Sequence, residues 1–158
     1  MASSEKNLSS YSRSNIPEID KKVFAIVVSE WNEAVTEAMY EGALNTLLEN
    51  GVSRENIIRK TVPGSFELSL AAQWMAQRDE VDAVICIGCV IQGETRHFDF
   101  ICDAVAHGLT QVGLKYDKPV IFGVLTPNTQ QQALDRAGGK HGNKGDEAAI
   151  TAVKMLGF

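Results

Sequence analysis

From residue 22 to the end of the chain, hydrophobic positions follow two alternating rhythms. Short runs of consecutive apolar residues, rich in Val and Ile, predict β-strands that are buried on both faces. Between these runs, apolar residues recur every three or four positions, which predicts amphipathic helices. Strands are expected at 23–29, 57–62, 81–91 and 120–125. The chain therefore alternates strand and helix.

Capping residues and the extent of each apolar stripe predict where the helices begin and end. The first is capped by Asn32 and stopped by Asn50. The second is capped by Ser65 and the third begins after Thr95. Their expected inner faces are Phe66, Leu70, Ala71, Trp74 and Met75 in the second, and Phe98, Ile101, Cys102, Val105, Leu109 and Val112 in the third. The last two are expected from 127 to about 137 and from 146 to 156, with a Gly- and Lys-rich loop at 138–145 between them.

The order strand, helix, strand predicts right-handed βαβ units. Such units build a parallel sheet with helices on both faces, so the expected fold class is α/β, a three-layer α/β/α sandwich around a four-stranded parallel sheet. In sheets of this kind ligands bind beyond the carboxyl ends of the strands. The segments 29–32, 63–67, 91–97 and 126–128 are therefore the candidate site.

The composition is that of one globular domain, with 158 residues of which 44% are hydrophobic and 22% charged. The net charge of −5 repels polyanions, so nucleic acid is not an expected partner. No apolar run is long enough to cross a membrane, and the first residues lack the apolar segment of a signal peptide. We expect a cytoplasmic domain at 22–158 that follows a flexible polar arm at 1–21.

Two of the three cysteines, Cys86 and Cys89, form a C-x-x-C motif, which occurs in metal and redox sites. Both lie in the expected strand 81–91, where residues three apart point to opposite faces. No second C-x-x-C and no nearby His pair completes a zinc site. We interpret both as small buried side chains in a reducing compartment and expect no metal. The alternative, a nucleophilic Cys89, predicts sensitivity to thiol alkylation.

Candidate chemistry gathers at the expected carboxyl ends of the strands. His97 falls in the first turn of a helix, where the helix dipole favours a neutral ring that can exchange protons. Gly93 and the free N–H groups of the same helix suit an anion. Trp31 can stack on a flat ring, and Ser65 and Glu67 can bind polar groups. The alternatives are a surface or capping His97, a capping role for Ser65 and Glu67, and a hydrophobic staple at Trp31.

The segment 136–145 brings Arg136, Lys140 and Lys144 around four glycines just before the last helix. Such a loop can turn several cations and N–H groups towards a phosphate. It is neither a P-loop nor a dinucleotide-binding glycine motif. The alternative is a solvated basic loop, and His141 within it receives no role.

Together these segments resemble the lumazine synthase family. The matching blocks are WN at 31–32, PGSFE at 63–67, GCVIQGETRHFD at 88–99, FGVLT at 122–126 and RAGGKHGNKG at 136–145. The resemblance runs from about residue 23 to 156. It implies a flavodoxin-like fold and a transferase of riboflavin biosynthesis. Such an enzyme condenses 5-amino-6-(D-ribitylamino)uracil with 3,4-dihydroxy-2-butanone 4-phosphate, without cofactor or metal, to 6,7-dimethyl-8-ribityllumazine, phosphate and water.

The resemblance also implies roles for individual residues. His97 matches the proton-transfer residue, Arg136 the residue that grips the phosphate, and Glu94 and Thr95 the turn that meets the keto-phosphate. The other matches contact the pyrimidine and its ribityl chain: Trp31, Asn32, Ser65, Phe66, Glu67, Cys89 through its backbone, Val90, Ile91, Phe122 and Lys144. Of these residues, Phe122, Arg136 and Lys144 are expected to act from the neighbouring subunit of a pentamer.

The same resemblance implies a homo-oligomer, as a pentamer, a decamer or a 60-subunit shell, with riboflavin synthase as a candidate partner. The arm at 1–21 is expected to lie against a neighbour and to add a strand to its sheet. Two other functions compete. An FMN-binding module predicts a Ser/Thr-rich phosphate loop after the first strand, where this chain has EWNE at 30–33. A flavin-binding shell without chemistry leaves His97, Arg136 and Lys144 unexplained.

Overall fold

The computed structural model describes residues 18–158, so the expectations for residues 1–17 lie outside the described residues. The strands are β1 (Phe24–Ser29), β2 (Ile57–Val62), β3 (Ala83–Cys89), β4 (Val120–Leu125), β5 (Ala137–Gly139) and β6 (Gly142–Asn143). The helices are α1 (Glu33–Glu49), α2 (Leu68–Ala76), α3 (His97–Tyr116), α4 (Gln130–Leu134) and α5 (Lys144–Leu156), with 3₁₀ turns η2 (Arg54–Asn56) and η3 (Ser65–Glu67). The four long strands were all predicted, although β3 is shorter than the apolar run at 81–91.

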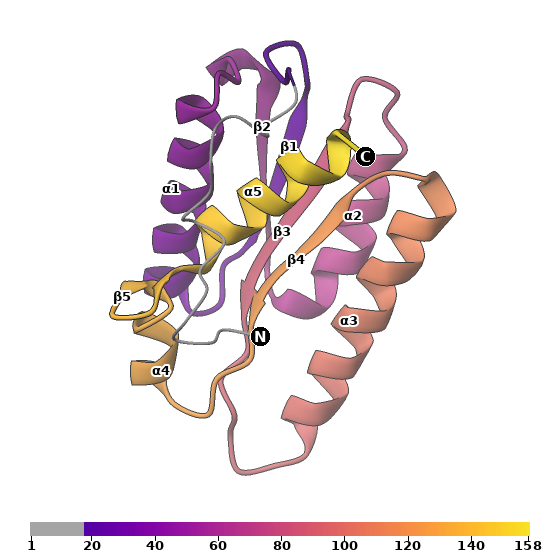
Figure 1. Ribbon diagram of the computed structural model, residues 1–158. Helices are drawn as coiled ribbons and strands as arrows, with labels where there is room; N and C mark the ends of the chain where they lie inside the picture. The colour runs from indigo at the N-terminus through magenta and orange to yellow at the C-terminus, as the bar shows by residue number, and fades with distance from the viewer. Residues whose placement is uncertain (1–17) are drawn as a thin grey trace.

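The four long strands form one parallel sheet in the order β2-β1-β3-β4. Helices α1 and α5 cover one face of this sheet, and α2 and α3 cover the other (Figure 1). The predicted three-layer α/β/α sandwich is therefore confirmed. The strand order is also the beginning of the 2-1-3-4-5 order of flavodoxin-like sheets, and it reverses between β1 and β3.

The two central strands carry the core. Every residue of β1 and β3 is buried, as expected for parallel strands covered on both faces. Their side chains alternate: Phe24, Ile26 and Val28 pack in the cluster beneath α1 and α5, whereas Ala25 and Val27 pack beneath α2 and α3. Full burial of side chains of this size stabilises a fold by roughly 1.5–3 kcal/mol each. The strand ends are thereby held on a rigid base.

The inner face predicted for the second helix is wrong in part. Phe66, Leu70 and Trp74 are more than half exposed, and the residues that face the sheet are Leu68, Ala71, Ala72, Met75 and Ala76. The helix begins at Leu68 because Ser65–Glu67 form a separate 3₁₀ turn. With this later start, Leu68, Ala72 and Ala76 join the inward face and Phe66, Leu70 and Trp74 stay on the surface.

The predicted end of the fourth helix, at about residue 137, is also wrong. Helix α4 ends at Leu134, and the segment expected as a loop forms a short antiparallel hairpin of β5 and β6. Gly138 and Gly142 have φ values of 106° and 76°, which side chains rarely adopt, so glycine permits this tight turn. Helix α5 then begins at Lys144, two residues earlier than predicted.

Candidate functional site

A hollow of 790 Å³ opens at the carboxyl end of the sheet, where the strand order reverses between β1 and β3. It is lined by Trp31, Asn32, Ser65, Phe66, Glu67, Cys89, Val90, Ile91 and His97, all of them predicted site residues, together with Gly64 and Ile101. We call it the ring hollow. Residues that are up to 70 positions apart in the sequence thus meet at the place where α/β sheets bind ligands.

Asn32 bridges the point of reversal. Its Nδ2 donates a hydrogen bond of 2.8 Å to the main-chain oxygen of Cys89, so the ends of β1 and β3 are tied together. Asn32 occupies the N-cap position of α1, as predicted. Its side chain does not cap the helix, however, because its backbone is left-handed (φ 61°, ψ 44°) and no side-chain capping bond forms. Asn adopts this conformation more readily than most residues.

Two aromatic side chains stand open at the ring hollow. Trp31 is 72% exposed and Phe66 is 56% exposed. A hydrophobic staple would bury its aromatic ring, so that alternative for Trp31 is wrong. Trp31 lies beside the turn after β2: its Cδ1 would be 3.4 Å from a Cβ added to Gly64. Aromatic faces left open beside polar groups suit stacking against a flat ring.

The turn η3 supplies polar groups to the same hollow. Glu67 accepts a 3.0 Å hydrogen bond from the backbone N–H of Gly64, which holds the turn closed. Ser65 does not cap α2 as predicted. Its hydroxyl is buried and has no hydrogen-bond partner within residues 18–158. An unpartnered buried hydroxyl costs about 1–3 kcal/mol, which a polar ligand group in the hollow would remove.

The turn η3 can sit this close to β3 because residue 88 is glycine. A Cβ on Gly88 would lie 2.5 Å from the Ser65 hydroxyl oxygen and 3.0 Å from Cδ1 of Leu68. Any other residue would push the turn away from the strand. Gly88 therefore sets the depth of the ring hollow, although it is not itself among the lining residues.

His97 is the first residue of α3 and is exposed. Its backbone N–H lies 3.4 Å from the hydroxyl oxygen of Thr95, and its ring has no hydrogen bond within the described part of the chain. Glu94 and Thr95 are exposed in the preceding loop and line neither this hollow nor the next one. The first turn of α3 is the positive end of a 20-residue helix, which favours a nearby anion.

A second hollow of 380 Å³ lies beyond the end of β4. It brings together three more of the predicted site residues, Phe122, Arg136 and Lys144, with Gln132 and the segment 124–128. We call it the cation hollow. Arg136 is half-buried there, and its Nη1 donates a 3.0 Å hydrogen bond to the main-chain oxygen of Gln132.

The three cations of the basic segment are not equivalent. Lys140 pairs with Asp135 at 3.0 Å, and Lys144 pairs with Glu147 at 2.6 Å. Within residues 18–158, Arg136 is the one cation of the three with no carboxylate partner. Its guanidinium is therefore the cation of this segment that is most available to pair with a phosphate.

Sequence reasoning missed the two carboxylates that neutralise these lysines. Glu147 lies three residues after Lys144 in α5, so helical spacing offered a signal for that pair. Asp135, just after α4, pairs with Lys140 in the turn of the hairpin, and this turn was predicted as part of a loop. His141 is exposed in this turn and lines neither hollow.

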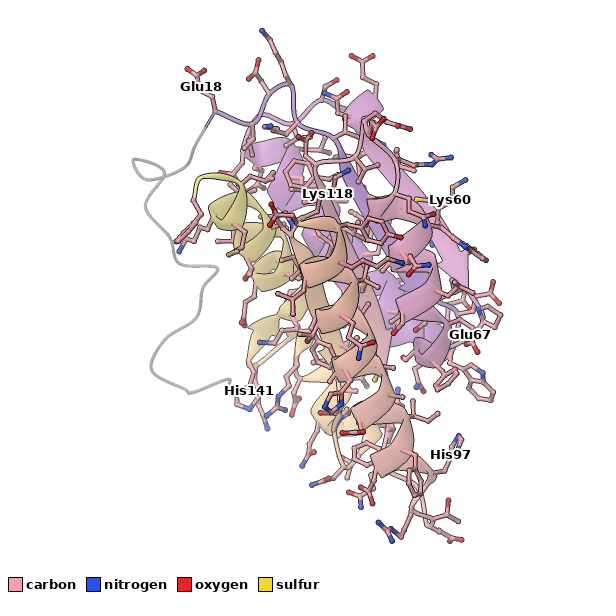
Figure 2. The ribbon with its side chains drawn as sticks, turned by 90° about the vertical axis from the view of Figure 1, so that its right-hand side faces the viewer. Glu18, Lys60, Glu67, His97, Lys118 and His141 are labelled. Atoms are coloured by element: carbon pink, nitrogen blue, oxygen red, sulfur yellow. The ribbon has the colours of Figure 1, made fainter. Side chains whose placement is uncertain are left out.

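One chain does not bring His97 and Arg136 together. The ring hollow is lined by His97 and not by Arg136, the cation hollow is lined by Arg136 and not by His97, and the two share no residue. Figure 2 shows Glu67 and His97 on one side of the molecule and His141, from the hairpin after Arg136, on the other. Twelve of the predicted site residues thus lie in two separate hollows.

The C-x-x-C cysteines lie on opposite faces of β3, as predicted: Cys86 packs beneath α2 and α3, and Cys89 beneath α1 and α5. Burial raises the pKa of both thiols, that of Cys89 to about 11. A thiol with such a pKa is protonated near neutral pH and is a poor nucleophile. Within residues 18–158, no three His, Cys, Asp or Glu side chains cluster as metal ligands do.

Comparison with known proteins finds matches that include the lining residues of both hollows. The sequence profile of the 6,7-dimethyl-8-ribityllumazine synthase family matches residues 21–158. The chain belongs to this family. A relative named 6,7-dimethyl-8-ribityllumazine synthase from Cytophaga hutchinsonii is 67% identical over 156 residues, which cover 99% of this chain and 98% of the relative.

Relatives with the same name occur in other bacteria. That of Porphyromonas gingivalis is 54% identical over 100% of this chain and 98% of its own length, and that of Parabacteroides distasonis is 52% identical over 100% and 99%. The lumazine synthase family is one of enzymes, and the chain matches these members from end to end. No helix among residues 18–158 is long and apolar enough to span a membrane.

Proposed function

We propose that the chain condenses 5-amino-6-(D-ribitylamino)uracil with 3,4-dihydroxy-2-butanone 4-phosphate. The products are 6,7-dimethyl-8-ribityllumazine, phosphate and water, in riboflavin biosynthesis in the cytoplasm and with no cofactor. The observation that carries the proposal is that the two hollows offer different chemical groups to a ligand. One offers exposed aromatic rings and a hydroxyl with no hydrogen-bond partner among residues 18–158, which suit a polar heterocycle. The other offers a guanidinium with no carboxylate partner among the same residues, which suits a phosphate.

In this proposal the ring hollow binds the pyrimidine and its ribityl chain. Trp31 stacks on the ring, and Glu67 accepts from ribityl hydroxyls with its carboxylate. The remaining contacts come from Asn32, Ser65, Phe66, Val90, Ile91 and the backbone of Cys89. Glu94 and Thr95 meet the keto-phosphate at the start of α3, where the helix dipole favours its charge.

The chemistry is mostly positioning. The amine of the pyrimidine attacks the ketone, and one water leaves to give an imine. Phosphate is then eliminated and the resulting enol tautomerises to a ketone. The ribitylamino nitrogen attacks this ketone and closes the ring with loss of a second water. Holding two flexible substrates together removes several kcal/mol from the barrier. Arg136 stabilises the departing phosphate, and His97 takes and returns the protons.

The two hollows form one site only if a second copy is present. We propose that Phe122, Arg136 and Lys144 of one copy face the ring hollow of its neighbour. The exposed apolar surface supports association: Leu114 is 80% exposed, and an 840 Å³ groove between α3 and α5 is lined by Phe122 and Met155 among others.

We propose a pentamer as the unit of assembly. Measurement of mass in solution distinguishes a pentamer, a decamer and a 60-subunit shell, and a monomer would contradict the shared site. Riboflavin synthase is the proposed partner of a shell. The strand that the arm at 1–21 is expected to add to a neighbour belongs to the same proposal.

The test is a turnover assay with both substrates. The expected result is lumazine and inorganic phosphate formed in equal amounts, at a rate that a metal chelator does not change. A purified protein that carries stoichiometric flavin and forms no lumazine would contradict the proposal. That outcome would favour a flavin carrier.

A further inference from the structure

Asp135 connects α4 to the hairpin that follows Arg136. Its carboxylate is only 12% exposed; it accepts a 2.9 Å hydrogen bond from Nε2 of Gln131 and pairs with Nζ of Lys140 at 3.0 Å. Its main-chain oxygen accepts a 2.8 Å hydrogen bond from the N–H of His141. The pKa of this carboxyl is below its ordinary value because Gln131 donates to it and Lys140 pairs with it. It is therefore ionised near neutral pH.

The hairpin also packs directly on the backbone of Asp135. A Cβ on Gly139 would lie 2.7 Å from Cα of Asp135 and 2.8 Å from the main-chain oxygen of Leu134. Only glycine allows the two segments to approach this closely. The turn of the hairpin is thus fixed to the end of α4 by a side-chain pair, a main-chain hydrogen bond and close packing.

The residues of the cation hollow depend on this attachment. Arg136 follows Asp135, and its main-chain oxygen accepts a 2.8 Å hydrogen bond from the N–H of Lys144, across the base of the hairpin. Its guanidinium is held by the main-chain oxygen of Gln132 in α4. Arg136 and Lys144 therefore keep their places only while the hairpin and α4 stay in register. Asp135 holds that register without lining the hollow.

We propose that Asp135 is a positioning residue for the phosphate of the substrate. Its carboxylate fixes the hairpin to α4 and thereby orients the Arg136 guanidinium. The inference rests on the proposed function, because it assigns the phosphate to the cation hollow.

Two mechanisms predict opposite results for Asp135→Asn. If Asp135 acted only through its charge, its removal would make the region more positive and would tighten phosphate binding. If it positions the hairpin, its removal loosens Arg136 and weakens phosphate binding. The sign of the change thus separates the two mechanisms without any assumption about its size.

The experiment measures the Kd of inorganic phosphate by calorimetry on the assembled protein, together with KM for each substrate. For Asp135→Asn we expect phosphate Kd and the keto-phosphate KM to rise about tenfold, the effect of misplacing one charge-assisted hydrogen bond, with the pyrimidine KM unchanged. Lys140→Met, which removes one of the ties, should have a smaller effect of the same sign. Asp135→Glu retains the charge and should recover most of the loss.

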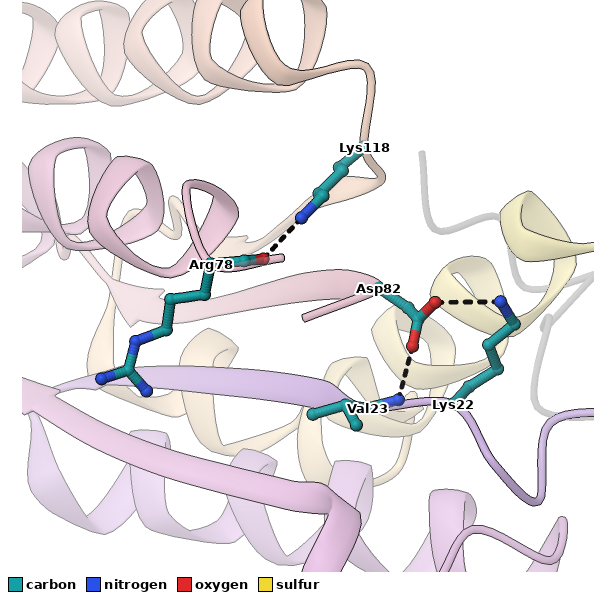
Figure 3. Close-up of polar contacts among 5 residues, drawn as sticks. All are labelled: Lys22, Val23, Arg78, Asp82 and Lys118. Atoms are coloured by element: carbon teal, nitrogen blue, oxygen red, sulfur yellow. Dashed lines mark hydrogen bonds and ion pairs between the residues drawn. The ribbon is translucent and has the colours of Figure 1, made fainter. Parts of the chain in front are cut away.

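Lys22→Met is the matched control. Lys22 pairs with Asp82 at 2.9 Å at the opposite end of the sheet (Figure 3), so its loss removes a comparable ion pair far from the hairpin. Its phosphate Kd should equal that of the unaltered chain. Unchanged or tighter phosphate binding by Asp135→Asn would overturn the inference, as would an equal rise in both KM values.

If Asp135→Asn does not fold, an unchanged Kd in Lys140→Met overturns the inference instead. The proposed function fails separately, if the unaltered chain forms no lumazine. The phosphate titrations still test the role of Asp135 in that case.

Discussion

At the amino end of the sheet, several polar side chains find their partners within the chain. Asp82, before β3, accepts a 2.8 Å hydrogen bond from the N–H of Val23 and pairs with Lys22 at the start of β1. Lys118, before β4, donates a 2.6 Å hydrogen bond to the main-chain oxygen of Arg78 (Figure 3). These contacts join the segments that lead into β1, β3 and β4.

At the carboxyl end, several polar groups have no such partner. The hydroxyls of Ser29, at the end of β1, and Ser65 are buried without a hydrogen bond inside residues 18–158. Arg136 has no carboxylate, and the ring of His97 has no hydrogen bond among the same residues. In the first turn of α5, burial raises the pKa of the Asp146 carboxyl, as do Glu49 and Glu147, although a backbone hydrogen bond lowers it.

The difference separates residues that hold the fold from residues that serve a ligand. A buried polar group without a partner costs about 1–3 kcal/mol, so folding alone would not favour several of them at one end. Departures of this kind collect at functional sites, where a ligand or a second chain supplies the missing partner. The unpartnered groups, more than the shape of the hollows, mark the carboxyl end as the site.

The largest effect is expected when the uncompensated cation is removed. Arg136→Ala should lower kcat/KM about a thousandfold, since the departing phosphate loses its main charge partner. His97→Ala should lower it about a hundredfold, because solvent can replace part of the proton transfer. Arg78→Ala, at the amino end, is the control and should leave kcat/KM unchanged. Full activity in Arg136→Ala, or a greater loss in His97→Ala, would contradict these roles.

A smaller effect is expected from filling the space under the ring hollow. In Gly88→Ala the new methyl group displaces Ser65 and the turn η3, so the KM for the pyrimidine should rise about tenfold, with a stability loss of about 1–3 kcal/mol. Steady-state kinetics and thermal unfolding measure the two effects.

Gly93→Ala provides the comparison for that variant, since no atom lies within 4 Å of the added Cβ. Its stability should be unchanged. A rise in its keto-phosphate KM alone would support contact between the phosphate and the turn before α3. Unaltered pyrimidine binding in Gly88→Ala would show that η3 does not shape the site.

Two carboxylates, Asp82 at the amino end and Asp146 in the first turn of α5, should respond to the same substitution with opposite signs. Asp82→Asn loses an ion pair and should destabilise the fold by about 1 kcal/mol. The raised pKa of Asp146 means that its ionised form destabilises the folded chain at pH values above that pKa. Asp146→Asn should therefore raise Tm at about pH 7.5, and the gain should shrink towards about pH 4 as the native carboxyl becomes protonated.

Thermal unfolding of both variants across this pH range is the measurement. A lower Tm in Asp146→Asn at neutral pH would mean that the backbone hydrogen bond to this carboxylate outweighs its burial and the nearby carboxylates. The contrast between Asp82 and Asp146 would then be contradicted.

The smallest effect is expected at the buried thiol. The raised pKa of Cys89 keeps it protonated, so Cys89→Ala should retain activity within about threefold and alkylating reagents should inhibit little at neutral pH. Rapid inactivation that substrate prevents would instead support a nucleophilic cysteine.

The sequence predicted the sheet well because its strands are continuous apolar runs with clear limits. It misplaced the inner face of α2, where the chain has two apolar stripes and only the start of the helix at Leu68 decides between them. Nine predicted site residues meet in the ring hollow: seven fall in segments expected at strand ends, and Cys89 and Val90 were implied by the family resemblance.

The roles of Asn32 and Asp135 could not be predicted in the same way. Asn32 bonds to Cys89, 57 residues away, and Asp135 pairs across a hairpin whose existence depends on the backbone of Gly138 and Gly142. Contacts of this kind depend on tertiary geometry. A linear pattern of residue types carries no signal for them.

The central claim is that the two hollows of neighbouring copies make one site, and mixing two defective variants tests it most directly. His97→Ala and Arg136→Ala chains are unfolded together in equal amounts and reassembled. If each site takes His97 from one copy and Arg136 from the next, about a quarter of the mixed sites are intact, and activity rises well above the mean of the two parents. If one copy supplied both residues, every site would carry a defect, and activity equal to that mean would contradict the account.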